Sequence, residues 1–315
     1  MIWLWVLFGF LLLILAFVLV ISYICYRITF YAPRRKPSGE SIQLPVGQIY
    51  DPYRKNMENW TKELRQMPHE EFTITSFDGL KLYGKYYEYA PGAPIELMFH
   101  GYRGSAERDL NGGVQRCRAL GRSTLLVDQR CSGKSDGRTI TFGICEYRDC
   151  LAWVDFIIRH FGPDVKIILT GISMGASTVL MAAGQPLPPN VIGVLADCGF
   201  TDAKSIIQDV VKKMGLPVKL SYPFVKLGAR LYGGFNLDET SALQAMKNCR
   251  VPVIFFHGEN DDFVPCDMSR ANYTACASEK KQLVTVPGAG HGLSYLVSPE
   301  KYLDALRDFF GTEAS

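Results

Sequence analysis

The sequence predicts an α/β fold, in which a mostly parallel β-sheet carries helices on both faces. Two strand-like segments, residues 71–77 and 81–89, flank Asp78 and Gly79, a dipeptide typical of β-hairpins. After this hairpin, apolar runs that fit buried strands alternate with helix-like segments, an order typical of parallel strands joined by helices. The 315 residues suit one such domain with a short additional segment.

About eight strands are expected in the sheet, and helices separate most of them. The strands are predicted at 71–77, 81–89, 95–100, 125–129, 165–171, 191–197, 251–258 and 281–287. The helices are predicted at about 105–121, 145–161, 174–184, 266–277 and 298–311. The interval between residues 200 and 250 breaks this rhythm, because its apolar and basic stretches contain no clear strand. We therefore expect a small helical cap inserted at about 201–249.

The N-terminal residues 2–24 contain no charged side chain and, as a helix, match the roughly 30 Å hydrocarbon core of a bilayer. Aromatic side chains such as Trp3 and Tyr26 lie near the two ends, where membrane proteins favour them. A cleaved signal peptide is the alternative, but it wants a basic start and a shorter apolar core. The expected organisation is a transmembrane anchor at 1–30, a linker at 31–70 with a short helix near 53–66, and a folded domain at 71–315.

Charge and cysteine content indicate which partners are excluded and which compartment the protein occupies. The net charge of +3 is too small to indicate a nucleic-acid partner. Nine cysteines occur without a CxxC pair, which argues against a zinc knuckle and favours reduced thiols in a reducing compartment. Basic residues follow the apolar run, and the positive-inside rule then puts the folded domain in the cytoplasm. These residues are Arg27, Arg34, Arg35 and Lys36.

A candidate nucleophile, Ser173, lies in the motif Gly171-x-Ser173-x-Gly175 between a predicted strand and a predicted helix. A sharp strand-to-helix turn lifts the serine hydroxyl out of the sheet, and glycines are needed because side chains would clash in so tight a turn. The helix N-terminus adds a backbone N–H and a positive dipole end for a developing oxyanion. A glycine-rich turn with a structural serine is the alternative interpretation.

Two further positions complete a candidate triad, whose chain order would be nucleophile, acid and base. Of the histidines after Ser173, His257 ends a buried strand and fits a structural role, whereas His291 lies in a glycine-rich loop after the last strand. Such a loop can bring an imidazole to the serine hydroxyl, so His291 is the predicted base. For the acid, Asp261 and Asp262 both follow the preceding strand, and either could instead cap the next helix.

An oxyanion hole needs a second N–H from the loop after the third strand, which begins His100-Gly101-Tyr102. Gly101 lets the backbone approach closely. We therefore predict that the N–H groups of Tyr102 and Met174 form the oxyanion hole, although this segment must also serve as a plain strand-to-helix turn.

Taken together, residues from about 70 to 312 resemble the α/β-hydrolase superfamily, and most closely membrane-anchored bacterial hydrolases of the serine aminopeptidase-like or esterase-like type. Four motifs and a terminal Gly-His-Gly carry the resemblance. They are His100-Gly101-Tyr102, the loop from Asp128 to Ser135, Gly171-Ile172-Ser173-Met174-Gly175, and His257-Gly258-x-x-Asp261-x-x-Val264-Pro265. The resemblance implies that Asp261 is the triad acid. Cys131 stands where the family pattern has glycine, a departure that leaves the catalytic groups in place.

The resemblance implies acyl transfer to Ser173 and then to water, with no metal or organic cofactor. We expect a hydrolase of carboxylic esters or thioesters, acting on a small or lipid-like substrate. A serine aminopeptidase-like peptidase and an inactive binding protein on the same fold are the alternatives. Apolar residues of the cap either form an acyl pocket or pack the cap onto the core. They are Leu216, Val218, Leu220, Phe224, Val225 and Leu231.

Overall fold

The computed structural model describes residues 1–33 and 41–311 and contains one eight-stranded sheet in the order β1-β2-β4-β3-β5-β6-β7-β8. β1 and β2 are antiparallel, β2 is antiparallel to β4, and the remaining pairs are parallel. The strands are β1 (Glu70–Thr75), β2 (Lys81–Tyr87), β3 (Ile95–Phe99), β4 (Ser123–Asp128), β5 (Ile167–Ile172), β6 (Val191–Asp197), β7 (Val253–Gly258) and β8 (Lys281–Val286). The predicted α/β-hydrolase fold is confirmed, with strand ends within three residues of those expected.

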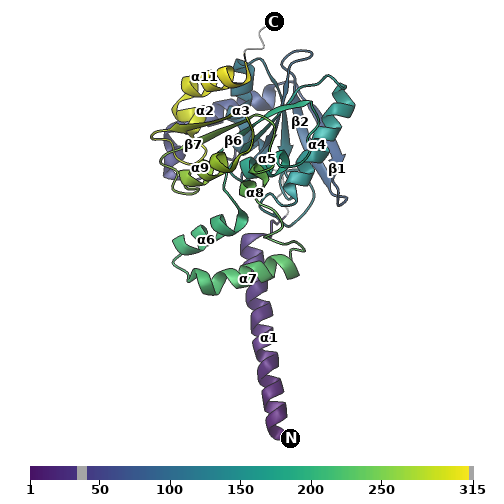
Figure 1. Cartoon of the computed structure of the whole chain (residues 1–315), viewed down its shortest axis with the longest axis vertical. Helices are drawn as coiled ribbons and strands as arrows, with labels where there is room; N and C mark the ends of the chain where they lie inside the picture. Colours follow the sequence, from purple (N-terminus) through teal and green to yellow (C-terminus); the bar gives the residue numbers. More distant parts are fainter. Residues whose placement is uncertain (34–40, 312–315) are drawn as a thin grey trace.

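Helices cover both faces of the sheet, as Figure 1 shows. Because side chains alternate along a strand, Leu97 and Phe99 of β3 join the core on one face, whereas Met98 joins the other. The first face carries α4 (Glu146–Phe161), α5 (Met174–Ala183), α8 (Ala242–Met246) and α9 (Cys266–Ala275); the second carries α3 (Ala106–Ala119) and α11 (Pro299–Phe310). Burial on both faces explains why β3 and β4 read as continuous apolar runs.

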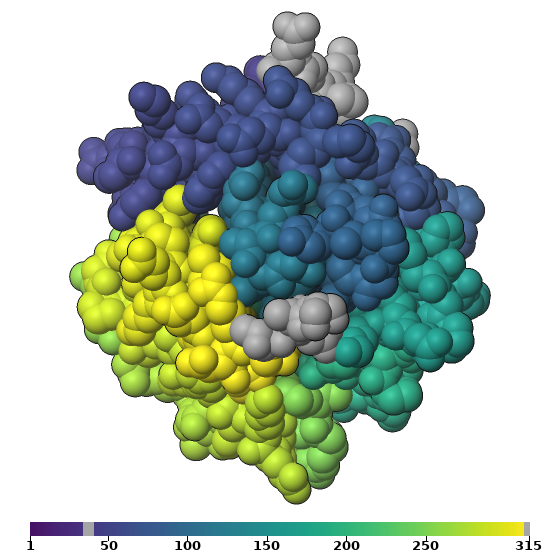
Figure 2. Space-filling model, turned by 90° about the horizontal axis from the view of Figure 1, so that it is seen from above, coloured from purple at the N-terminus to yellow at the C-terminus, as the bar shows by residue number. Residues whose placement is uncertain are grey.

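The segment before the sheet, residues 41–69, packs against the domain. A short 3₁₀ helix, η1 (Gln48–Tyr53), leads into α2 (Arg54–Gln66), which packs on α3. Asn111 on α3 donates a hydrogen bond of 3.0 Å to the hydroxyl of Thr61 on α2. In Figure 2 this early segment appears in dark blue beside the yellow C-terminal residues. It therefore adds a wall to the domain.

Two further features stand apart from the sheet in Figure 1. Helix α1 (Ile2–Thr29) extends away from the domain, and the most apolar part of this 28-residue helix is not buried. Between it and the sheet lie α6 (Ala203–Lys213) and α7 (Val218–Leu231), and α7 packs across α1. By length and composition α1 is a candidate membrane span. The basic residues Arg34, Arg35 and Lys36 lie outside the described residues.

Candidate active site

Ser173 sits at the turn between β5 and α5 with a backbone conformation that few side chains adopt, φ 56° and ψ −119°. The turn is tight enough to exclude larger residues on both sides. A Cβ added to Gly171 would lie 2.1 Å from the carbonyl oxygen of Gly175, and one added to Gly175 would lie 2.0 Å from that of Phe99. This strained turn fixes the serine hydroxyl at the carboxyl edge of the sheet.

His291 and Asp261 reach Ser173 from the loops after β8 and β7. His291 Nε2 lies 2.9 Å from Ser173 Oγ, and His291 Nδ1 lies 2.7 Å from an oxygen of Asp261. The other oxygen of Asp261 accepts the backbone N–H groups of Phe263 and Val264 at 2.9 and 2.8 Å. These three predicted site residues therefore form one continuous chain of hydrogen bonds. Asp262, the competing acid, is exposed to solvent.

A second histidine, His257, contacts the same oxygen of Asp261 that His291 contacts. The side chain is fully buried, and its Nε2 lies 2.9 Å from the carbonyl oxygen of Val264 and 3.2 Å from Asp261. Both neighbours accept hydrogen bonds, so Nε2 carries the proton and Nδ1 accepts from the hydroxyl of Ser269 at 2.7 Å. Burial acts to raise the pKa of Asp261, but the hydrogen bonds from His257 and His291 outweigh it and hold that pKa below its ordinary value.

The predicted oxyanion loop lies directly beside the serine, because a Cβ on Gly101 would be 3.8 Å from Ser173 Oγ. Among the described residues, neither the Tyr102 amide nor the Met174 amide has a hydrogen-bond acceptor. Two N–H groups without acceptors flank the serine, which is the arrangement that a developing oxyanion requires. Their catalytic role remains a prediction.

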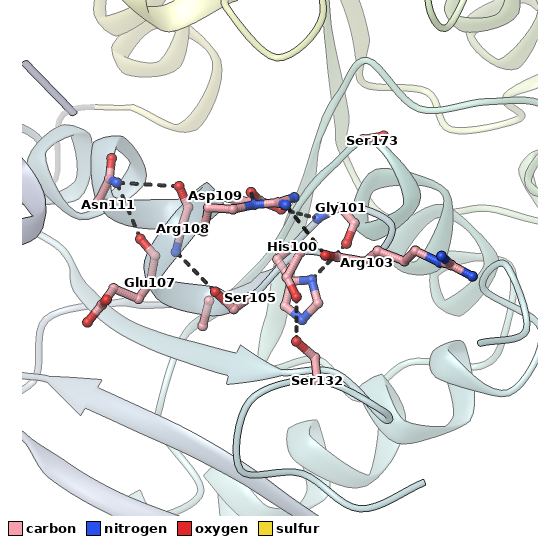
Figure 3. A network of polar contacts seen from close by, with 12 residues as sticks. His100, Gly101, Arg103, Ser105, Glu107, Arg108, Asp109, Asn111, Ser132 and Ser173 are labelled. Atoms are coloured by element: carbon pink, nitrogen blue, oxygen red, sulfur yellow. Dashed lines mark hydrogen bonds and ion pairs between the residues drawn. The ribbon is translucent and has the colours of Figure 1, made fainter. Parts of the chain in front are cut away.

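Asp109 on α3 fixes this loop, and the sequence did not single it out. Its carboxylate accepts the Gly101 N–H at 3.0 Å, as Figure 3 shows, and it pairs with the guanidinium of Arg108. A Cβ added to Gly104 would overlap the same carboxylate, so the loop and the helix fit together closely. The only signal in the sequence was an acidic residue in the first turn of the helix that follows the loop, where such residues are common.

The same loop is tied to the end of α1. The hydroxyl of Tyr102 donates to the carbonyl oxygen of Thr29 at 2.6 Å, and the guanidinium of Arg103 donates to that of Ile28 at 2.7 Å. Carbonyl groups in the last turn of a helix lack partners within the helix, so these side chains cap it. The N-terminal helix and the oxyanion loop are thereby joined directly.

A cavity of about 210 Å³ opens beside Ser173 and is mostly apolar. Its walls come from α3, from the strand ends, from the loop after His291 and from the segment before the sheet. Tyr50 of that segment also donates a hydrogen bond of 3.0 Å to the carbonyl oxygen of His291. Apolar wall residues include Tyr50, Met57, Trp60, Met98, Leu110, Ile172, Leu195, Tyr295 and Leu296.

The proposed cap contributes no wall to this cavity, although residues 201–249 are all described. The suggestion that its apolar residues form an acyl pocket is therefore wrong. Val225 is instead buried against the domain, and Leu216, Leu220 and Leu231 are exposed. The sequence offered no sign that the segment before the sheet would supply the wall in their place.

Both carboxylates that line the cavity already have partners. Asp109 is held by Arg108 and the Gly101 amide, as described above. Asp197 accepts hydrogen bonds of 3.0 Å from the hydroxyls of Ser294 and Tyr302, and burial raises its pKa. Among the described residues, the cavity therefore offers no free acidic group to a cationic substrate.

One group of potential metal ligands occurs among the described residues, formed by Cys198, Asp261 and His291. Burial raises the pKa of the Cys198 thiol well above its ordinary value, which disfavours the thiolate that binds metals. The other two side chains are engaged with each other and with Ser173. Acyl transfer suits this arrangement better than metal binding.

Comparison with known proteins agrees with this fold. The sequence profile of the prolyl oligopeptidase family matches residues 141–314, just over half of the chain. The uncharacterized protein YqkD of Bacillus subtilis is 27% identical over 191 residues, which are 60% of this chain and 62% of YqkD, so the match spans less than two thirds of that relative. Protein bem46 of Schizosaccharomyces pombe is 23% identical over 286 residues, 90% of this chain and 85% of its own length.

A solved structure resembles the whole domain. The Pyrococcus furiosus esterase Pf2001 superimposes with a TM-score of 0.65 at 22% identity, covering 88% of this chain and 97% of the esterase. At this identity the likeness shows that the two proteins share a fold.

Proposed function

From the premise that this chain belongs to the prolyl oligopeptidase family of α/β-hydrolases, we propose that it is a membrane-anchored serine hydrolase that cleaves carboxylic esters or thioesters. The observation that carries the proposal is the continuous hydrogen-bond chain from Ser173 through His291 to Asp261. The arrangement supports acyl transfer, because a serine, an imidazole and a carboxylate at these distances form an activated nucleophile.

The proposed reaction follows from the direction of these hydrogen bonds. His291 takes the proton from Ser173 Oγ as the oxygen attacks the substrate carbonyl, and the amides of Tyr102 and Met174 stabilise the oxyanion. His291 then gives the proton to the leaving alcohol or thiol, which departs and leaves an acyl-serine. Water, deprotonated by the same imidazole, attacks the acyl group and releases the acid. Asp261 holds the imidazole and stabilises its charged form throughout.

An ester or thioester substrate is supported by the cavity beside Ser173. Its apolar walls and volume of about 210 Å³ suit an acyl chain of modest length. The family name favours a peptidase as the second candidate. An aminopeptidase, however, needs an unpaired acidic group to bind the substrate's ammonium group. The two carboxylates that line the cavity in the described part of the chain, Asp109 and Asp197, already accept hydrogen bonds.

The membrane anchor is proposed on the length and apolarity of α1. A signal sequence passes the same test. However, α1 packs against α7, and the side chains of Tyr102 and Arg103 cap its last turn. Cleavage of α1 would remove these contacts. We place the catalytic domain on the cytoplasmic side on the basis of the charge that follows the helix. Protease protection of sealed vesicles tests this orientation.

A fluorophosphonate probe tests the nucleophile. We expect labelling of the wild type and none of Ser173→Ala, with Ser177→Ala as the matched control on the same helix. Persistent labelling of Ser173→Ala overturns the assignment. p-Nitrophenyl esters of graded chain length, compared with aminoacyl-nitroanilides, test the substrate class. Hydrolysis of the anilides alone contradicts the ester proposal and favours the peptidase.

A further inference from the structure

Helix α7 crosses α1 with the two backbones in close contact at Gly228. A Cβ added to Gly228 would lie 2.4 Å from the carbonyl oxygen of Ser22, so only glycine fits at this crossing. Just beyond the helix, the Tyr232 hydroxyl donates to the carbonyl oxygen of Leu19 at 3.1 Å, and its ring lies 5.2 Å from that of Tyr23. The position of α7 along α1 is thereby fixed at residues 19–26.

This position coincides with the level at which α1 would leave a membrane. A span of about 20 residues crosses the hydrocarbon core, so a helix that enters near Ile2 emerges close to Ser22. Tyr23 and Tyr26 at this level are side chains typical of the interface. Figure 1 shows α7 crossing α1 between the domain and the free part of α1. The crossing therefore lies where lipid headgroups meet the acyl chains.

The side chains of α7 divide into two opposite faces. Tyr222, Val225 and Ala229 are buried and belong to the core cluster shared with the domain. Leu220, Phe224, Leu227 and Leu231 repeat at intervals of four, three and four residues, which places them on one face of the helix away from that core. Leu220 is 64% exposed and Leu231 is 52% exposed. Phe224 and Leu227, between these two, are partly exposed.

Basic side chains border the apolar stripe. Lys219, Lys226 and Arg230 lie on one flank of it by the same helical spacing and are exposed. Lys226 pairs with Asp238. The turn before α7 repeats the pattern, with Lys212 and Lys213 followed by Met214 and Leu216, which are 59% and 47% exposed. Apolar residues flanked by lysine and arginine are typical of helices that lie in the plane of an anionic membrane surface.

We propose that α7 and the turn before it are a second membrane contact, an interfacial helix whose apolar stripe dips into a bilayer that carries anionic lipids. The inference rests on the proposed anchor, because α1 supplies the level at which α7 lies. Two contacts instead of one fix the tilt as well as the height of the domain. The oxyanion loop is bonded to the end of α1, so the site is held at a defined distance from the lipid.

Tryptophan fluorescence of the full chain in vesicles of phosphatidylcholine and phosphatidylglycerol tests this proposal. Leu220→Trp is introduced after Trp3 and Trp5 are replaced by phenylalanine, and the lipids carry bromine on their acyl chains. Trp60 and Trp153 remain in the domain, so the emission of the same chain with Leu220 intact is subtracted. We expect the emission of the new tryptophan to be blue-shifted and to lose at least half of its intensity to bromine quenching. The matched control, Tyr89→Trp, should escape quenching, because Tyr89 is exposed and lies beside the start of β4, at the edge opposite the serine.

Replacing Lys219, Lys226 and Arg230 together by glutamine should make the quenching at position 220 independent of the phosphatidylglycerol content. Quenching of Trp3 and Trp5 in the unmodified chain, without quenching at position 220, overturns the proposal and leaves the anchor standing. If Trp3 and Trp5 also escape quenching, both the interfacial-helix proposal and the anchor proposal are refuted. A blue shift without quenching shows that protein covers the stripe, which likewise refutes a lipid contact. Fluorophosphonate labelling reports the hydrolase proposal separately.

Discussion

Replacing Asp261 by asparagine exchanges one oxygen for an NH₂ group, and the structure fixes which oxygen is lost. One carboxylate oxygen accepts the backbone N–H groups of Phe263 and Val264. An amide nitrogen there would face two donors, so the remaining oxygen of the new side chain must take this position. The NH₂ group then takes the place of the oxygen that lies 2.7 Å from His291 Nδ1 and 3.2 Å from His257 Nε2, and the Nε2–H of His257 keeps the carbonyl oxygen of Val264 as its acceptor.

The consequence is an exchange of protons on the imidazole. Because the NH₂ group can only donate, His291 must accept through Nδ1 and carry its proton on Nε2, which faces Ser173 Oγ at 2.9 Å. In this tautomer the ring cannot take the serine proton. Serine proteases altered in the same way lose about 10⁴-fold in kcat, or about 5 kcal/mol of transition-state stabilisation, and we expect a loss of this order here.

The assay is hydrolysis of a p-nitrophenyl ester, with thermal unfolding measured in parallel. Asp262→Asn is the matched control, because its side chain is exposed and adjacent in sequence, and it should keep the wild-type kcat. If Asp261→Asn retains more than about a tenth of the wild-type kcat while staying folded, the tautomer argument is refuted. If the control loses activity instead, Asp262 is the acid.

Two further results are expected. Asp109→Ala should lower kcat by roughly 10²-fold to 10³-fold with little change in KM, because the Gly101 amide loses its acceptor and the oxyanion loop shifts. An unchanged kcat, measured over a range of ester concentrations, would show that the carboxylate does not position the loop. Glu96 is fully buried, and although burial acts to raise its pKa, Arg116 and Arg122 lower it from 4.5 to about 2. A carboxyl group whose pKa is lowered on folding stabilises the folded protein at any pH above its pKa in the unfolded chain. This stabilisation is lost as the pH falls towards its pKa in the folded protein. The stability difference between wild type and Glu96→Gln should therefore narrow by about 3 kcal/mol between about pH 5 and pH 2 in acid unfolding experiments, and a constant difference would contradict this.

The fold could be predicted because its signals are local. Strands such as β3 and β4 are buried on both faces, and they read as apolar runs between helix-like segments. The turn at Ser173 was recognisable because its motif is short. Both of its glycines are required, since a side chain at either position would collide with backbone atoms of the turn itself or of the neighbouring strand. The sequence left Asp261 and Asp262 unresolved, because neighbours in a turn differ only in the direction that the folded backbone gives them.

The wall of the cavity shows what sequence reasoning missed. Apolar residues of the cap were one candidate for the acyl pocket, but they are either buried in the core or exposed on the surface, away from the cavity. Tyr50 and Trp60 take that place, although the segment that carries them read as a linker. Tyr50 contacts His291, 241 residues away in the chain, and no local pattern encodes such a contact.

The sequence by itself determined the class of fold, the apolar N-terminal helix, the serine at its turn and His291 as the predicted base. Each depends on short-range periodicity or on a motif with a fixed backbone geometry. Tertiary structure alone decided that Asp261 meets His291, that Asp109 holds the oxyanion loop, that the segment before the sheet walls the cavity, and that α7 crosses α1 at Gly228. These contacts join segments far apart in the chain, and packing of the whole molecule selects them.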